Sequence, residues 1–136
     1  MPALGTLEMY EALAECLDRD PDWDSLGQPL DYSMIHVYTA PVDKAFFLRF
    51  DHGKLTDVHE VAELEKESAD FVLTAAPDVW KRVYSKVPKA RASGFHLGLS
   101  TGQILFTGPF MQTYLKQNKA WEHLLDLVSL NKLVDG

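Results

Sequence analysis

Residues 102–118 read GQILFTGPFMQTYLKQN and predict a short strand followed by a helix. The predicted strand, residues 104–107, is mostly apolar and lies between Gly102 and Gly108, and the helix is expected to begin near Pro109. At about 100° per residue, its large apolar side chains share one broad face: Phe110, Met111, Tyr114 and Leu115. This face either closes an ordinary core or forms the wall of a space for a ligand.

Two further segments predict helices with large apolar side chains on one face. The first begins at Pro77, which suits the first turn of a helix, and carries Trp80, Val83, Tyr84 and Val87. The second, over residues 120–134, carries Trp121, Leu124, Leu125 and Val128. Large, adaptable side chains suit irregular or exchangeable contents. They therefore favour a space that a ligand fills, whereas the plain alternative is that they pack together.

The middle of the chain predicts an antiparallel strand meander. β-Branched and aromatic residues concentrate in three segments, 32–40, 44–51 and 54–61. His52 and Gly53 stand where a two-residue hairpin turn belongs. A polar crossing then leads to a further strand over residues 70–76.

One domain over residues 1–136 is expected, because the length and the 46% of hydrophobic residues suit a single core. Thr6 is expected to cap an N-terminal helix, and residues 19–31 form a turn-rich connector. The order of elements predicts an α+β fold whose helices cover one side of the sheet.

Charge is distributed unevenly along the chain. The net charge is −7, yet residues 79–121 hold seven bases and no acid. The acidic remainder repels phosphate and argues against a nucleic-acid partner. Five bases are candidates for binding a head group or another anion: Lys81, Arg82, Lys86, Lys89 and Arg91. They equally fit a solvated helix face that balances the acidic half.

The N-terminal residues give no sign of a secretory signal, because Glu8, Glu11 and Glu15 replace the expected positive stretch. No apolar run approaches the ~18 residues that a membrane span needs. Cys16 is the one cysteine, and its place in a helical pattern predicts a buried thiol. A cytoplasmic location is the expectation.

The sequence nominates no catalytic residue, metal or cofactor. No histidine lies in an HExxH-like or CxxC-like frame. His52 and His59 could meet across the hairpin and bind a metal, but an acidic, solvated surface explains the same residues. The segment GLSTG, residues 98–102, has its serine one position away from the spacing of a nucleophile elbow.

Four segments in this order, FLRFDHGK, ADFVLTA, PDVWKRVYSKV and GQILFTGP, make the chain resemble the lipid-binding domain of the sterol carrier protein type two family. In that family a glycine, a short alternating strand and Thr-Gly lead into a helix that lines a lipid tunnel. Gly102, Ile104, Phe106, Thr107 and Gly108 occupy those positions, and Asp70 matches the acid that opens the preceding strand. The chain departs from the family's Lys-rich strand at Gln103 and Leu105.

The resemblance implies a mostly antiparallel five-stranded sheet covered by helices. It also implies a hydrophobic tunnel between sheet and helices that holds fatty acids, fatty acyl-CoA or sterols. The expected tunnel residues are Trp80, Val83, Tyr84, Val87, Phe95, Ile104, Phe106, Phe110, Met111, Tyr114, Leu115 and Trp121. Residues 119–136 add a helix that could cap the tunnel or pair two subunits.

Three functions are therefore open. The favoured one is non-catalytic binding or transfer of an apolar ligand, with transient contact to an anionic membrane. The second is an accessory subunit or small enzyme, in which Tyr84, His96 or Tyr114 would act on an apolar substrate. The third is a ligand-free homodimer whose last helix turns its apolar face to the partner.

Overall fold

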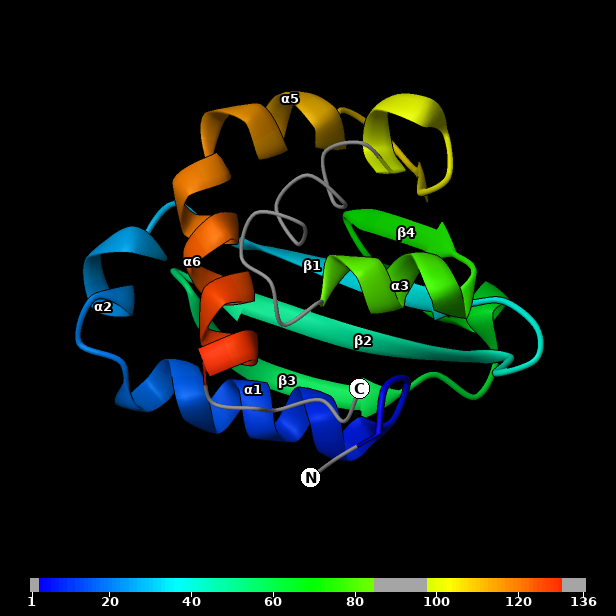
Figure 1. Cartoon of the computed structure of the whole chain (residues 1–136), viewed down its shortest axis with the longest axis horizontal. Coiled ribbons are helices and arrows are strands. Elements are labelled where there is room, and N and C mark those ends of the chain that lie inside the picture. The colour runs from blue at the N-terminus through cyan, green and yellow to red at the C-terminus, as the bar shows by residue number, and fades with distance from the viewer. Residues whose placement is uncertain (1–2, 85–97, 131–136) are drawn as a thin grey trace.

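The computed structural model describes residues 3–84 and 98–130, and it has a sheet with helices packed over it (Figure 1). The strands are β1 (Tyr32–Tyr38), β2 (Lys44–Asp51), β3 (Lys54–Glu60), β4 (Phe71–Ala75) and β5 (Leu105–Phe106). The helices are α1 (Leu7–Arg19), α2 (Trp23–Leu26), α3 (Pro77–Val83), α5 (Phe110–Lys116) and α6 (Asn118–Leu130), with a 3-10 turn η1 (Leu64–Lys66). The predicted α+β fold is confirmed. None of these helices is long and apolar enough to cross a bilayer.

The five strands form one sheet in the order β3-β2-β1-β4-β5. The pairs β1–β2, β2–β3 and β4–β5 are antiparallel, which confirms the meander. β4 instead runs parallel to β1, so the sheet is mixed. Because β3 and β4 lie on opposite sides of the β1–β2 pair, residues 61–70 have to cross a face of the sheet.

The hairpin between β2 and β3 has the predicted two-residue turn. His52 and Gly53 have φ angles of 50° and 93°, which is the left-handed pair that a tight β-hairpin needs. A Cβ on Gly53 would lie 2.6 Å from the carbonyl oxygen of Gly27. The Gly53 amide donates to the Leu30 carbonyl (2.8 Å), and the Trp23 indole donates to the Gly53 carbonyl (2.7 Å). The turn therefore holds the connector that follows α1.

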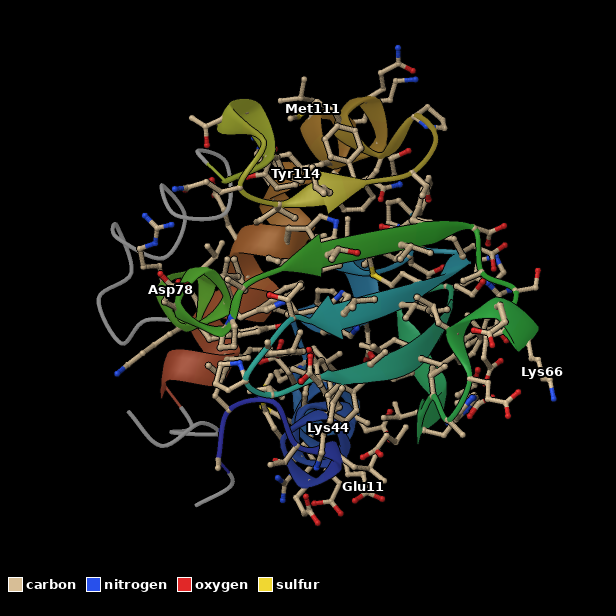
Figure 2. The ribbon with its side chains drawn as sticks, turned by 90° about the vertical axis from the view of Figure 1, so that its right-hand side faces the viewer. Glu11, Lys44, Lys66, Asp78, Met111 and Tyr114 are labelled. Atoms are coloured by element: carbon tan, nitrogen blue, oxygen red, sulfur yellow. The ribbon has the colours of Figure 1, made fainter. Side chains whose placement is uncertain are left out.

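The two faces of the sheet differ in what covers them. Figure 2 shows α3, with Asp78, on one side of the sheet and η1, with Lys66, on the other. On β2 every second side chain faces the helices, and Phe46, Leu48 and Phe50 are buried beneath them. The opposite face carries a small separate cluster around Ile35, Ala45 and Val61. The main core, and any site inside it, lies on the helix side.

α1 packs on β3 and contacts α6. The side chains it buries are Met9, Tyr10, Leu13, Cys16 and Leu17, so the thiol is buried as predicted. Thr6 occupies the N-cap position, but its hydroxyl donates to the Ala3 carbonyl (2.7 Å) and does not cap the helix amides.

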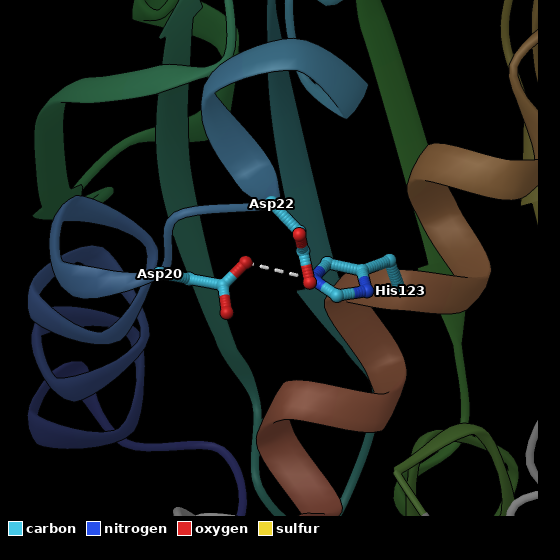
Figure 3. Close-up of side chains that lie close together, drawn as sticks. All are labelled: Asp20, Asp22 and His123. Carbon is cyan, nitrogen blue, oxygen red and sulfur yellow. Dashed lines mark hydrogen bonds and ion pairs between the residues drawn. The ribbon is translucent and has the colours of Figure 1, made fainter.

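A contact between Asp20 and His123 joins the end of α1 to α6 (Figure 3). The His123 Nε2 atom lies 2.7 Å from Asp20 Oδ2, and the same oxygen accepts the Trp23 backbone amide at 2.9 Å. The His123 ring also stacks on the Trp23 indole at 6.4 Å between centroids. Asp22 lies close enough for the three side chains to share a cation. These contacts fix where α6 crosses the core.

Candidate functional site

Phe110, the first residue of α5, is the centre of the apolar wall that the sequence predicts. Its side chain is fully buried. Its ring meets Phe71 of β4 edge-on at 5.2 Å, Phe106 of β5 at 6.3 Å and Trp121 of α6 at 6.2 Å. The contacts with Phe71 and Trp121 are edge-to-face, and such contacts add to the stabilisation from burial. Strands β4 and β5 of the sheet therefore meet helices α5 and α6 at one apolar centre, the Phe110 ring.

The residues between β5 and α5 direct the helix back over the sheet. Thr107 pairs with the edge of β4, since its hydroxyl accepts the Val72 amide (2.9 Å) and its own amide donates to the Val72 carbonyl (3.2 Å). Gly108 follows with a φ of 62°, a conformation that favours glycine. Thr107 and Gly108 therefore act by positioning the wall.

Asp70 has a similar positioning role at the start of β4. Its carboxylate accepts the Ser33 amide at 2.9 Å, and its own amide donates to the Ser33 hydroxyl at 3.1 Å. This exchange ties the start of β4 to β1 in the parallel pair. The acid that the resemblance singled out is thus explained by strand pairing.

Trp80 of α3 is the centre of a second, polar part of the interior. Its side chain is fully buried and stacks on His36 (4.8 Å) and Tyr38 (5.1 Å) of β1. It also stacks on Tyr84 at 6.2 Å. Its indole N–H donates to the Val37 carbonyl at 3.0 Å. Trp80 therefore packs α3 against the middle of the sheet.

Under Trp80 lies the buried polar cluster, which we define as Tyr10, His36, Tyr38 and Tyr84. The Tyr10 hydroxyl lies 3.0 Å from His36 Nδ1 and 2.8 Å from the Tyr38 hydroxyl. Burial raises the pKa of Tyr10, Tyr38 and Tyr84, and it lowers the pKa of His36 to about 3. All four groups are consequently uncharged at neutral pH.

The sequence interpretation missed three of these four groups. Tyr38 and His36 alternate with Val37 in β1, and this alternation could have placed them on the helix side. Tyr10 shares the apolar face of the N-terminal helix with Leu13 and Leu17, where periodicity predicts only an ordinary core residue. Its hydrogen bonds span 26 and 28 residues of sequence, which helix periodicity does not reveal.

Most of the expected tunnel residues within the described part of the chain lie in the interior. Those with buried side chains are Trp80, Val83, Tyr84, Ile104, Phe110, Tyr114 and Trp121. Phe106 and Met111 are partly buried against the same core. Leu115 is 54% exposed and lies apart from the others on the outside of α5. Val87 and Phe95 fall outside the described residues.

The proposed anion-binding residues are only partly described. Lys81 and Arg82 are exposed on α3, and Arg82 donates to the Gln103 side-chain oxygen at 2.8 Å. Lys86, Lys89 and Arg91 fall outside the described residues. Burial raises the pKa of Tyr84 and Tyr114, so both hydroxyls stay protonated at neutral pH, and His96 is not described.

The apolar face of α6 packs inside its own chain. Trp121, Leu124, Leu125 and Val128 are all nearly inaccessible and belong to the main core. The idea that these four side chains face a second subunit is therefore wrong, because the core has already removed them from solvent.

The exposed histidines of the hairpin belong to different clusters. His52 lies 2.9 Å from Asp51 and 3.8 Å from Asp31. His59 instead contacts Asp57 at 3.0 Å and Glu67 at 2.8 Å. Each thus has its own acidic partners.

An open cleft of about 610 Å³ lies away from the apolar wall, at the end of α1 beside α2 and the hairpin turn. Its walls are mostly polar: Leu17, Asp18, Trp23, Asp24, Gln28, Asp51, His52 and Lys54. From the sequence this region is the end of a helix, a turn-rich connector and a hairpin turn. Its turn residues gave no pattern from which a cleft could be predicted.

Comparison with family models gives no match, and comparison with curated proteins gives none either. Solved structures do match. A conserved protein of Thermus thermophilus, suggested to be a sterol carrier protein, has a TM-score of 0.76 at 18% identity, over 98% of this chain and 91% of its own. A crystal structure of sterol carrier protein 2 has a TM-score of 0.73 at 17% identity, over 93% and 97%.

A third match is palmitated SCP2L2 from Aedes aegypti. It has a TM-score of 0.54 at 10% identity, over 83% of this chain and 91% of its own. At these identities the likeness concerns the fold, and the agreement extends over most of each chain. The chain has the fold of the sterol carrier protein 2 domains.

Proposed function

We propose that this protein binds an apolar ligand, such as a fatty acid, a fatty acyl-CoA or a sterol-like lipid, between its sheet and its helices, and performs no chemical step on it. One observation carries the proposal. The fold is that of sterol carrier protein 2 domains, and the large apolar groups of α3, α5 and α6 converge on the helix side of its sheet.

The energy for such binding comes from burying the ligand. Each methylene that leaves water contributes about 0.8 kcal/mol, so a dozen contribute roughly 10 kcal/mol before the costs of ordering the ligand and the wall. A micromolar dissociation constant needs only about 8 kcal/mol. Apolar contact therefore supplies energy of the required order, and Lys81 and Arg82, both exposed, support a further attraction to an anionic head group or membrane.

A titration of the purified protein with a fluorescent fatty acid tests the proposal. We expect saturation at one ligand per chain in the micromolar range. Met111→Asp is expected to weaken binding at least ten-fold, because Met111 is partly buried beside the core and a carboxylate there must be desolvated. Gln112→Asp is the matched control, since it introduces the same charge on the exposed side of α5.

No saturation up to about 100 μM, where less than ~5.5 kcal/mol of binding energy would be available, would remove the proposal. Equal weakening by the two substitutions would also count against it, because a general effect of charge on α5 would then explain the loss. Both variants need a circular dichroism spectrum that matches the parent protein.

A further inference from the structure

The buried polar cluster has one ring nitrogen for which the described residues supply no partner. His36 is 2% exposed, and its Nδ1 atom contacts the Tyr10 hydroxyl. Its Nε2 atom is buried without a hydrogen bond to any group in the described part of the chain. Because an unmade buried hydrogen bond is costly, a ligand that completes it gains affinity.

His36 lies on the same face of the sheet as the apolar groups that would hold the proposed ligand. It lies on the helix side of β1, directly under the Trp80 ring. Its neighbour in the parallel strand is Leu73, which is in turn paired with Phe106 of β5. The imidazole therefore lies on the same face of the sheet as the apolar wall, and one residue, Leu73, separates it from Phe106.

The chemistry of the cluster selects the kind of group that fits. If the Tyr10 hydroxyl donates to Nδ1, then Nε2 carries the proton and needs an acceptor. If Nδ1–H donates to Tyr10, then Nε2 is an acceptor and needs a donor. A hydroxyl group satisfies either case, because its oxygen accepts and its proton donates.

A carboxylate does not suit this position. Burial holds His36 and the three tyrosines in their neutral forms, and no described charged side chain hydrogen-bonds to the cluster. An anion there would lose its hydration without gaining a counter-charge.

We propose that His36 Nε2 is a recognition point for an uncharged oxygen, above all a hydroxyl group, on the ligand that enters the core. This inference rests on the proposed function and names the ligand class: apolar molecules with a neutral alcohol end that is buried at His36. A fatty acid binds by its chain alone and makes no bond to this nitrogen.

Three probes of equal chain length test this: hexadecane, hexadecan-1-ol and palmitate, each delivered from cyclodextrin to the full chain. We expect the alcohol to bind about ten-fold more tightly than the alkane, the typical value of one buried hydrogen bond. His36→Phe keeps an aromatic ring under Trp80 and leaves Tyr10 bonded to Tyr38. In that variant the ratio between alcohol and alkane is expected to fall to about one.

A direct readout does not depend on the variant folding. In ¹⁵N-labelled wild-type protein, the Nε2 resonance of His36 is expected to move on addition of hexadecan-1-ol and to stay unchanged with hexadecane or palmitate. An unchanged Nε2 resonance at saturating alcohol would overturn the inference, as would an equal shift with palmitate. If none of the three probes binds, the proposed function itself fails. If alkane and alcohol bind equally, that function stands and only the role of His36 is lost.

Discussion

The two ends of the interior are built differently, although the same sheet supports both. Around Phe110 the contacts are aromatic and apolar, and Phe71, Phe106 and Trp121 surround it. Around Trp80 the rings carry polar atoms, and Tyr10 and His36 join α1 to β1 by hydrogen bonds under the indole.

The difference shows how one core combines tolerance with selectivity. An apolar wall accepts many shapes, because dispersion and burial have no preferred direction. A buried polar cluster accepts few ligands, since each of its donors and acceptors needs a partner with defined geometry. The end around Phe110 is therefore suited to an alkyl chain or ring, and the end around Trp80 is suited to discriminating between ligands.

The largest effect on stability is expected from replacing Trp80, because its ring stacks on three of the four residues of the buried polar cluster. Trp80→Ala is expected to lower the free energy of unfolding by about 4 kcal/mol, the usual cost of deleting a large buried aromatic side chain. Urea denaturation followed by circular dichroism measures the change. Phe110→Leu, which only trims the apolar end, is expected to cost about 1 kcal/mol. Similar costs for the two variants would contradict this expectation, since only Trp80→Ala opens a large cavity and removes the hydrogen bond to the Val37 carbonyl.

Acid is expected to destabilise the polar end through His36. Its pKa is about 3 in the folded state and about 6.5 when unfolded, so the unfolded chain binds more protons between these values. The contribution of neutral His36 to the free energy of unfolding is complete above pH 6.5 and is lost progressively as pH falls toward 3. Between pH 7.5 and 5.0 the loss is about 2 kcal/mol. His36→Phe should remove this part of the pH dependence. If the free energy of unfolding falls equally with pH in the parent and the variant, His36 is not its source.

The hydroxyl of Tyr10 is expected to contribute about 1.5 kcal/mol, since Tyr10→Phe leaves His36 Nδ1 without its partner and Tyr38 with one bond fewer. The matched control is Tyr32→Phe. The Tyr32 hydroxyl donates to Gln117, which is only partly buried and can turn to water. We expect about 0.5 kcal/mol there. A larger loss at Tyr32 than at Tyr10 in the same denaturation assay would contradict the buried cluster.

The smallest effect on stability is expected from His59, on the exposed side of the sheet. The carboxylates of Asp57 and, to a smaller extent, Glu67 accept hydrogen bonds from the His59 ring and raise its pKa above 6.5. Its stabilising contribution is thus complete below pH 6.5 and is lost as pH rises through the folded pKa, the reverse of His36. In a titration followed by NMR, Asp57→Asn should lower this pKa. An unchanged value would show that the carboxylate does not hold the ring.

Local patterns were enough to predict the elements. The strand expected over residues 44–51 coincides with β2, and the helix expected from Pro77 begins there. The hairpin at His52 and Gly53 and the strand-turn-helix at residues 102–118 were also predicted correctly. These features depend on alternation, periodicity and turn chemistry between near neighbours, which the order of residues records directly.

The structure was needed for everything that depends on distant contacts. Nothing in the sequence shows that β4 runs parallel to β1, because either direction has the same alternation. The outward position of Leu115 follows from how α5 is rotated on the core. The hydrogen bonds that join Tyr10 with His36 and with Tyr38 exist only because α1 packs across the sheet.

The sequence by itself determined an α+β fold with an apolar helix face behind Gly108, because side-chain period and backbone freedom are local properties. Only the tertiary structure decided that this face meets α6 and β4, and that the four rings of the buried polar cluster gather around Trp80. Burial and hydrogen-bond pairing are set by neighbours from the whole chain, and those neighbours exist only after folding.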